Sequence, residues 1–251
     1  IYDRSVQGLG CIWWQFITTW QGYLELLNLP FNHPGQHPVI AQLTPANTLI
    51  PDCFDELVVC LRHGGVVVAP TDTVYGLFGI ATDPGVVGRI ARLKCRSAGM
   101  PIPVAVADAA MASDLVADIP NDAAYLMQRF WPGALTIVME ARAGLPHDIV
   151  SSGTIGLRAP NHPFLLRMIR CAGRPLTATS ANLSGGPQPV SPGVIDASLL
   201  RNVDFVIDAG HLSSGVPSTV LDLSKDTPHF IRVGAISQED IEEVLGKSIR
   251  K

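Results

Sequence analysis

From residue 52 onward, segments with the signals of helices alternate with short β-branched runs. Acidic residues open the stretch 52–65 and two glycines close it, which predicts a helix; the apolar run 66–70 ends at a proline and predicts a buried strand. Asp83 before Pro84 marks the start of the next helix. Helices are predicted at 52–65, 82–96, 121–133, 162–173 and 237–246, and strands at 66–70, 102–107, 134–140, 154–160, 176–180, 204–210, 218–224 and 229–235.

The late strands follow one another without helices between them. This order predicts an α/β fold, a single domain with a twisted mixed sheet flanked by helices. The chain has 251 residues, 47% of them hydrophobic and 16% charged, which is enough to bury a core of that size. We place the domain at 46–251 and treat 1–45 as an N-terminal extension of unknown role.

The extension contains the aromatic-rich stretch 11–27, which polar residues interrupt and which is shorter than the roughly 20 apolar residues that span a bilayer. We therefore expect no membrane segment. The stretch predicts either an amphipathic helix that docks on the domain or a poorly ordered extension, joined by a linker at 28–38. The five cysteines form no C-x-x-C pair and no zinc-type spacing, which predicts reduced thiols and a cytoplasmic location.

The net charge of −4 argues against a protein that coats nucleic acid by bulk charge. The charge is unevenly distributed, because no Asp or Glu lies between Asp148 and Asp196 or between Asp83 and Asp108, while both intervals contain several cations. Two basic segments in an acidic chain predict a local site for an anion. For some of these arginines, a solvated helix face is the alternative.

Two stretches place polar groups where an element ends. APTDTVYGL at 69–77 follows a strand, so the hydroxyl groups of its threonines would point into a ligand crevice or cap a turn. RLKCRSAGMP at 92–101 ends a helix with two cations. These suit either a polyphosphate or the helix C-terminus.

Two more stretches follow strands. TIGLRAPNHP at 154–163 places Arg158 at the end of a strand, where its guanidinium could bind a carboxylate. LTATSANLSGG at 176–186 offers hydroxyl, amide and backbone N–H groups to an anion. Neither the P-loop nor the G-x-G-x-x-G fingerprint occurs in the chain. The residues alone thus predict an anion-binding α/β domain.

These four stretches, with PSTVLD at 217–222 and FIRVGAIS at 230–237, resemble in order the motifs of the YrdC-like family of L-threonylcarbamoyladenylate synthases. PTDTVYGL is similar to the family's P-T-[ED]-T-x-Y-G-L, and LKCRSAGMP to its K-x-R loop. LRAPNHP is similar to its V-R-x-P-x-H-P, and TSANLSG to its S-x-S-A-N-x-S-G. Each motif is modest alone, but the six in register span about residues 50–246.

The resemblance implies an enzyme that joins L-threonine, bicarbonate or CO₂ and ATP into threonylcarbamoyl-AMP and releases pyrophosphate, with Mg²⁺ screening the phosphates. It implies handover of the product to a complex that modifies tRNA, and it allows direct contact with tRNA or other RNA. No dedicated nucleophile is implied, so catalysis rests on positioning and on charge stabilisation by Lys94 and Arg96. By their places in the motifs, threonine is assigned to Thr71, Arg158 and Ser218, and ATP to Lys94, Arg96, Thr154, Ser180, Asn182 and Arg232; no metal ligand is assigned.

Met100 stands where the family often has a lysine, which removes a cation beside the predicted phosphate site. Two other functions stay open. A related carbamoyl-adenylating enzyme that uses carbamoyl phosphate would have the same kind of domain, although such enzymes are usually long chains with zinc-type cysteine motifs. A non-catalytic RNA-binding or ribosome-assembly factor would show salt-sensitive RNA binding without ATP turnover.

Overall fold

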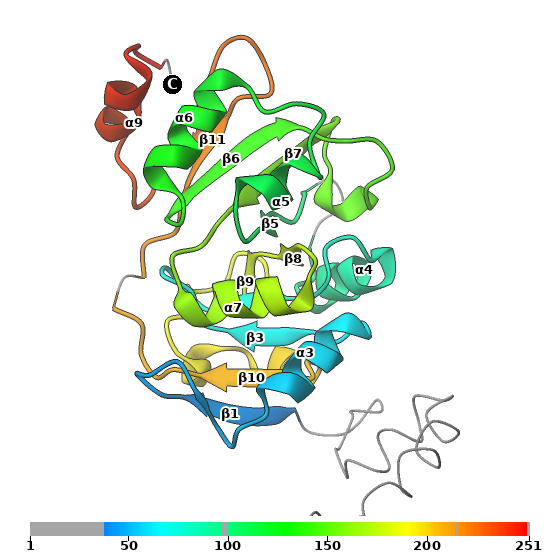
Figure 1. The fold of residues 1–251 in the computed structure, drawn as a ribbon. Coiled ribbons are helices and arrows are strands. Elements are labelled where there is room, and N and C mark those ends of the chain that lie inside the picture. The colour runs from blue at the N-terminus through cyan, green and yellow to red at the C-terminus, as the bar shows by residue number, and fades with distance from the viewer. Residues whose placement is uncertain (1–37, 97–99, 214, 250–251) are drawn as a thin grey trace, which may run out of the picture.

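The computed structural model describes residues 38–96, 100–213 and 215–249 (Figure 1). The predictions for the stretch 11–27 and for the linker before residue 38 lie outside the described residues. Within the described part, no helix is long and apolar enough to cross a membrane. The cysteines of this part are all free thiols, as predicted.

The five predicted helices are present with shifted ends, and two short helices at Ala109–Ser113 and Ala197–Leu200 were not predicted. The Asp83 carboxylate caps α4 by accepting hydrogen bonds from the N–H groups of Gly85 and Val86. Gly173 ends α7 at a φ of 70°, in the left-handed region that glycine adopts most readily. The described helices are α3 (Phe54–Arg62), α4 (Pro84–Leu93), α5 (Ala109–Ser113), α6 (Asn121–Phe130), α7 (Pro163–Ala172), α8 (Ala197–Leu200) and α9 (Gln238–Leu245), with 3₁₀ turns at His147–Ile149 and Pro192–Val194.

The described strands form two six-stranded mixed sheets. The first sheet has the order β2-β1-β10-β3-β4-β9, and the second has the order β12-β11-β6-β7-β5-β8. In Figure 1 the second sheet lies in the upper part of the molecule with α6 and α9, and the first lies in the lower part with α3. The strands are β1 (Val39–Leu43), β2 (Leu49–Ile50), β3 (Val67–Ala69), β4 (Gly76–Phe78), β5 (Val104–Ala105), β6 (Leu135–Glu140), β7 (Thr154–Arg158), β8 (Leu176–Thr177), β9 (Thr179–Ser180), β10 (Phe205–Asp208), β11 (Thr219–Asp222) and β12 (His229–Arg232).

The two sheets meet where the predicted strand 176–180 divides at Ala178. Before this residue, β8 pairs with β5 of the second sheet; after it, β9 pairs with β4 of the first. The N–H of Ala178 donates to the carbonyl of Pro103 at 2.7 Å, so the chain passes from one hydrogen-bond ladder to the other within five residues. The mixed α/β class is confirmed, and the expected single sheet is two sheets because this one strand serves both.

β1 belongs to the folded domain, although its residues fall within the predicted extension. It pairs in parallel with β10, with Val39 opposite Phe205 and Gln42 opposite Asp208. Since β1 is an inner strand of the first sheet, the domain boundary predicted at residue 46 is too late. The run is short and has a proline on each side, which conceals a strand in the sequence.

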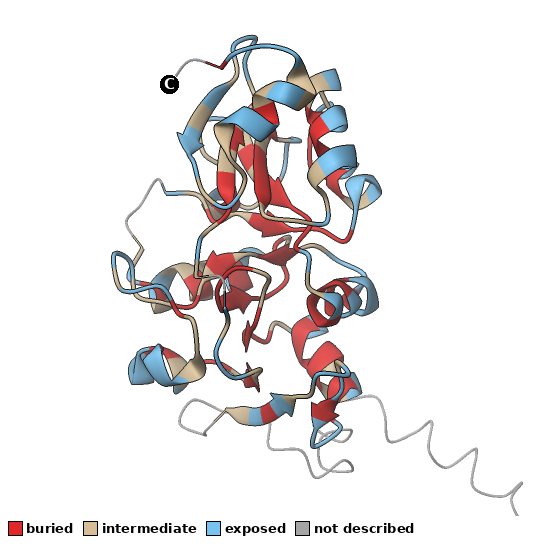
Figure 2. Ribbon diagram, turned by 90° about the vertical axis from the view of Figure 1, so that its left-hand side faces the viewer, coloured by how far each residue is buried: buried red, intermediate tan, exposed pale blue. Residues whose placement is uncertain are grey.

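Two clusters of buried hydrophobic residues hold the sheets to their helices. Figure 2 colours the buried parts of the ribbon red. In one, α3 and α7 pack on the first sheet, and the rings of Phe54 and Phe164 meet edge to face with centroids 5.7 Å apart. The other joins α4, α6 and α9 to strands of both sheets. The ends of the strands that carry the six motifs are therefore fixed by a packed core.

Candidate active site

The second sheet brings polar residues from distant motifs to one edge. β6 and β11 run parallel, while β7 is antiparallel to β6 and β12 is antiparallel to β11. Thr136 of β6 is opposite Val220 of β11, which is opposite Arg232 at the end of β12. Arg158 ends β7 and Ser218 directly precedes β11. Strand polarity thus places the ends of β7 and β12 beside the starts of β6 and β11.

A pocket of about 190 Å³ lies between this edge and the loops of the first sheet. Pockets for drug-sized ligands have volumes of roughly 300–1,000 Å³, so this one suits a ligand of amino-acid size better than a nucleotide. Among the described residues that line it there is no Asp or Glu, but there are three arginines, Arg96, Arg158 and Arg232. Such a lining favours an anionic ligand.

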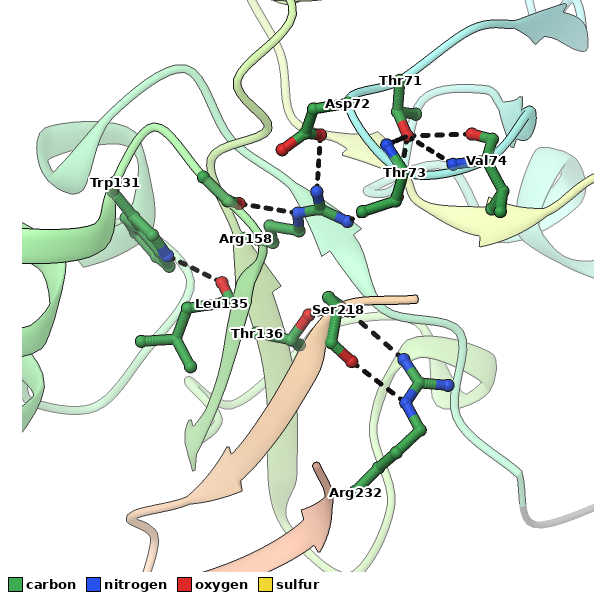
Figure 3. Close-up of polar contacts among 11 residues, drawn as sticks. Thr71, Asp72, Thr73, Val74, Trp131, Leu135, Thr136, Arg158, Ser218 and Arg232 are labelled. Carbon is green, nitrogen blue, oxygen red and sulfur yellow. Dashed lines mark hydrogen bonds and ion pairs between the residues drawn. The ribbon is translucent and has the colours of Figure 1, made fainter. Parts of the chain in front are cut away.

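Arg158 is held in place by three contacts from both sheets (Figure 3). Its Nε donates to the carbonyl of Gly133 at 2.8 Å, its Nη2 to Oδ1 of Asp72 at 2.5 Å, and its Nη1 to Oγ1 of Thr73 at 3.2 Å. Burial lowers the pKa of Arg158, and the Asp72 carboxylate offsets part of that shift. Three of its five N–H donors have acceptors among the described residues, which leaves two for a ligand carboxylate.

The Thr71 hydroxyl shapes the loop that follows β3. It accepts hydrogen bonds from the N–H groups of Thr73, at 2.9 Å, and Val74, at 3.2 Å, and it donates to the carbonyl of Val74 at 2.8 Å. Thr71 and Thr73 both line the pocket. The hydroxyl of Thr71 therefore forms the turn that presents Thr73 and Asp72 to Arg158.

Ser218 connects β6, β11 and β12 at the pocket. Its hydroxyl lies 3.0 Å from Oγ1 of Thr136. Arg232 donates from Nε to the Ser218 carbonyl at 3.0 Å and from Nη2 to its hydroxyl at 3.3 Å. Burial and the nearby charge of Arg158 lower the pKa of Arg232. Two guanidinium groups that repel each other across one pocket are stabilised when an anion lies between them.

Lys94 is buried, with 2% of its surface exposed, and it does not line the pocket. Its Nζ donates to the carbonyls of Ser180 and Asn182, the latter at 2.6 Å, and to Oδ1 of Asn182 at 3.1 Å. Burial, with a smaller effect of Arg96, lowers the pKa of Lys94 to about 8. The lysine of the K-x-R motif thus contacts main chain and an amide in this structure.

Arg96 lies between the first pocket and a second hollow of about 540 Å³. Its Nε donates to the carbonyl of Met100 at 2.8 Å and its Nη2 to that of Pro101 at 2.7 Å. The second hollow is also lined by Met100, Asp148 and the turn at 151–153. Its volume lies within the range for nucleotide-sized ligands. Because Arg96 lines both spaces, one ligand could extend from one into the other.

The remaining predicted residues take separate places. Ser180 lines the pocket, and its hydroxyl donates to Oδ1 of Asn182 at 2.6 Å. Asn182 donates to the carbonyls of Gly186, at 2.8 Å, and Pro187, at 3.1 Å, and lies outside the pocket lining. The Thr154 hydroxyl donates to the Ser151 carbonyl at 2.8 Å, beside the second hollow.

The structure therefore brings six of the nine predicted site residues to one pocket, and Lys94, Asn182 and Thr154 lie around it. The six are Thr71, Arg96, Arg158, Ser180, Ser218 and Arg232. The predictions did not include Asp72 and Thr136, and they gave Thr73 only as a hydroxyl that points into a ligand crevice or caps a turn. In the structure these three residues hold the arginine and the serine in place. A threonine inside the apolar run at 134–140 and an acid between two threonines at 71–73 are the signals that point to them.

Known proteins resemble the chain in sequence across this site. The model of the Sua5/YciO/YrdC family, described as "Telomere recombination", matches residues 59–234. Threonylcarbamoyl-AMP synthase of Bacillus subtilis is 39% identical over 74% of this chain and 54% of its own length. The enzyme of the same name from Pyrococcus abyssi is 37% identical over 74% of this chain and 55% of its own length. The chain thus spans about half the length of these curated relatives.

A solved structure gives the same picture for the fold. The crystal structure of Pyrococcus abyssi Sua5 complexed with L-threonine superposes with a TM-score of 0.78 at 32% identity. The match covers 85% of this chain and 62% of that one. The family model covers well over half of the chain and includes the residues that line the pocket from Thr71 to Arg232. On these grounds the chain belongs to the Sua5/YciO/YrdC family.

Proposed function

We propose that this chain makes threonylcarbamoyl-AMP from L-threonine, bicarbonate or CO₂, and ATP, and releases pyrophosphate. The observation that carries the proposal is the small, arginine-lined pocket in which Arg158, Ser218 and Arg232 meet. It is supported by two relatives named threonylcarbamoyl-AMP synthase and by the related Sua5 structure with L-threonine. The pocket has the size and the charge that the substrate amino acid requires.

Threonine would occupy the first pocket with its carboxylate on Arg158. The two N–H donors that Arg158 keeps are enough for a bidentate contact, and Asp72 and Thr73 hold the guanidinium in place for it. Ser218 and Arg232 would bind the opposite side of the substrate. Because these groups are fixed before the ligand arrives, binding requires little ordering of side chains.

The nucleotide would occupy the second hollow and reach the first pocket past Arg96. Thr154, beside the turn at 151–153, lies on the nucleoside side of this path, and Ser180 lies on the phosphate side. In the reaction the threonine amine loses a proton and forms an N–C bond to CO₂. An oxygen of the resulting carbamate then bonds to the α-phosphorus of ATP, and the bond between that phosphorus and the pyrophosphate oxygen breaks.

The protein's part in this chemistry would be alignment and charge stabilisation. The guanidinium groups of Arg96 and Arg232 border the space where negative charge develops on the phosphates. The described lining of the first pocket offers no carboxylate, and that of the second hollow offers one, Asp148. No group of three His, Cys, Asp or Glu occurs among the described residues. These residues do not fit a Mg²⁺ ion held by the protein. Magnesium would enter on the phosphate oxygens of ATP.

The fate of the product stays a prediction from the family resemblance. A tRNA-modifying complex would accept the threonylcarbamoyl group, because a mixed anhydride with AMP is an activated acyl donor. Direct contact with tRNA is a prediction of the same kind, and the cytoplasmic location stays a prediction from the cysteine pattern.

Pyrophosphate release tests the proposal. Wild-type protein is expected to release pyrophosphate from ATP only when both L-threonine and bicarbonate are present, and Arg158→Gln is expected to lose most of this threonine-dependent release. Arg142→Gln is the matched control, because Arg142 is an exposed arginine that donates to the Ser113 carbonyl. Folded protein that binds RNA in a salt-sensitive way but releases no pyrophosphate would instead support the non-catalytic alternative.

A further inference from the structure

The lysine of the K-x-R motif lies behind the wall of the site. Lys94 follows the last residue of α4, and 2% of its surface is exposed. Neither the first pocket nor the second hollow has it in its lining, whereas its neighbour Arg96 lines both. A ligand in either space would therefore meet Arg96 and not the ammonium group of Lys94.

The hydrogen-bonding capacity of Lys94 is fully used. An ammonium group has three N–H donors and no acceptor. In the described structure, Nζ has three acceptors, the carbonyls of Ser180 and Asn182 and Oδ1 of Asn182. A phosphate oxygen could bind this group only by displacing one of them. Arg96, by contrast, has acceptors for three of its five donors among the described residues.

The side-chain hydrogen bonds of Lys94 all go to one segment, residues 180–187, which we call the 180–187 turn. The Lys94 carbonyl accepts from the N–H of Ser184 at 3.0 Å, so main chain and side chain both hold the turn. Asn182 links this contact to the end of the turn, because its Nδ2 donates to the carbonyls of Gly186 and Pro187. The Ser180 hydroxyl, which donates to Oδ1 of Asn182, is thereby oriented at the pocket wall.

We infer that Lys94 is a positioning residue that sets the conformation of the 180–187 turn, and that Arg96 supplies the direct cationic contact to the phosphates. Lys94 acts on the nucleotide only through the turn. Its place in the motif, two residues before Arg96, puts the anchor and the ligand contact at the same helix end. The consequence for ATP rests on the function proposed above; the anchoring of the turn does not.

Hydrogen exchange without any nucleotide tests the anchoring directly. In Lys94→Met, which keeps side-chain length and removes the donors, the amides of the 180–187 turn are expected to exchange at least about tenfold faster than in wild type. The amides of β6 and β7 report whether the rest of the fold is intact and are expected to be unchanged. Arg96→Met is the matched control, because it removes the neighbouring cation and leaves the turn's contacts to Lys94 in place.

Labelling of amines in wild-type protein provides a test that needs no variant to fold. Lys94 is expected to react with a methylating reagent far more slowly than the exposed Lys225, with and without ATP. Reaction of Lys94 as fast as Lys225 without ATP, and protection once ATP is added, would mean that its ammonium group is open to phosphate, and would overturn the inference.

The binding of ATP and of threonine to Lys94→Met distinguishes a local effect on the turn from a general loss of structure. Lys94→Met is expected to raise the KM for ATP by at least about tenfold while threonine still binds with wild-type affinity, because Arg158 and its partners are untouched. Unchanged exchange in the turn together with lost ATP binding would show direct phosphate contact and contradict the inference. If wild-type protein releases no pyrophosphate, the proposed function fails, and the exchange and labelling results still decide the role of Lys94.

Discussion

The two sides of the pocket use their cations in different ways. On the side of the second sheet, Arg158 and Arg232 extend from strand ends and keep donors directed at the ligand space. On the other side, Lys94 and Arg96 follow a helix end and spend donors on main-chain carbonyls of neighbouring loops. Strand register places the first pair at one end of the sheet, and contacts to neighbouring loops then fix the guanidinium groups. The second pair lies among irregular segments, which need side-chain anchors to take one conformation.

We call the side with Arg158 and Arg232 the strand-borne side, and the side with Lys94 and Arg96 the loop-borne side. The largest effect is expected from a substitution on the strand-borne side. Arg158→Gln leaves the Asp72 carboxylate without its ion-pair partner in a largely buried position. This lowers the free energy of unfolding. The substitution also removes the guanidinium partner of the threonine carboxylate, which costs about 3 kcal/mol of binding, so kcat/KM for threonine is expected to fall by roughly 100-fold or more. Steady-state kinetics with threonine as the varied substrate measures this. A loss no larger than that of Arg142→Gln would show that Arg158 does not bind the substrate.

A pH titration examines the loop-borne side. The lowered pKa of Lys94, about 8 against an ordinary 10.5, means that the unfolded chain holds this proton more tightly than the folded protein. The contribution of Lys94 to the free energy of unfolding therefore rises with pH, by about 2 kcal/mol between pH 7 and pH 9.5. Urea unfolding at both pH values is expected to show this gain in wild type and not in Lys94→Met.

The affinity for ATP is expected to fall between pH 7 and pH 9.5, whereas the free energy of unfolding rises. Above pH 8 the neutral amine of Lys94 has two N–H donors for three acceptors, which loosens the 180–187 turn. Arg96 is the charged neighbour that also lowers this pKa, so Arg96→Met is expected to move the midpoint of the change to higher pH. ATP affinity and stability that rise together above pH 8 would contradict the anchoring role.

Ser218→Ala is expected to have a smaller effect on the strand-borne side. The substitution removes the hydroxyl partner of Thr136, which is 3% exposed, and one acceptor of Arg232. The free energy of unfolding is expected to fall by about 1–2 kcal/mol, and the KM for threonine to rise. Ser213→Ala, at an exposed serine, is the control for chemical denaturation. If both substitutions lower the free energy of unfolding equally, the contacts of Ser218 do not contribute to stability.

The smallest effect is expected at the rim of the second hollow. Met100 is 57% exposed there, so Met100→Lys adds a solvated cation near the hollow proposed for the nucleotide. Exposed charges contribute less than about 1 kcal/mol, which corresponds to a decrease of a few-fold in the KM for ATP that disappears at high salt. Val194→Lys, at another exposed apolar residue, is the control. A decrease that persists at high salt would indicate a buried contact instead.

The sequence predicts the strand-borne side better than the loop-borne side, for a physical reason. Arg158 follows a recognisable strand, and strand polarity in an α/β fold directs such residues to a common edge. Its pairing with Asp72 could not be predicted, because the two residues are 86 positions apart and local patterns carry no information on that contact. The α4 cap at Asp83 is local and was predictable in full.

The burial of Lys94 is the clearest case of what a pattern conceals. A lysine at a helix end beside an arginine normally extends into solvent. Here its ammonium group is buried and donates to three oxygens of Ser180 and Asn182, which lie 86 and 88 positions further along the chain. The division of the strand 176–180 between two sheets has the same origin. In both cases the outcome depends on what residues 176–182 pack against, which local sequence patterns do not specify.

Calorimetric binding of L-threonine and of ATP to wild type, Arg158→Gln and Lys94→Met tests the two-sided account most directly. We predict that Arg158→Gln loses affinity for threonine and keeps its affinity for ATP, whereas Lys94→Met loses affinity for ATP and keeps its affinity for threonine. If both variants, still folded, lose the two ligands to the same extent, the two sides do not act separately, and the distinction between strand-borne ligand contacts and a loop-borne anchor is wrong.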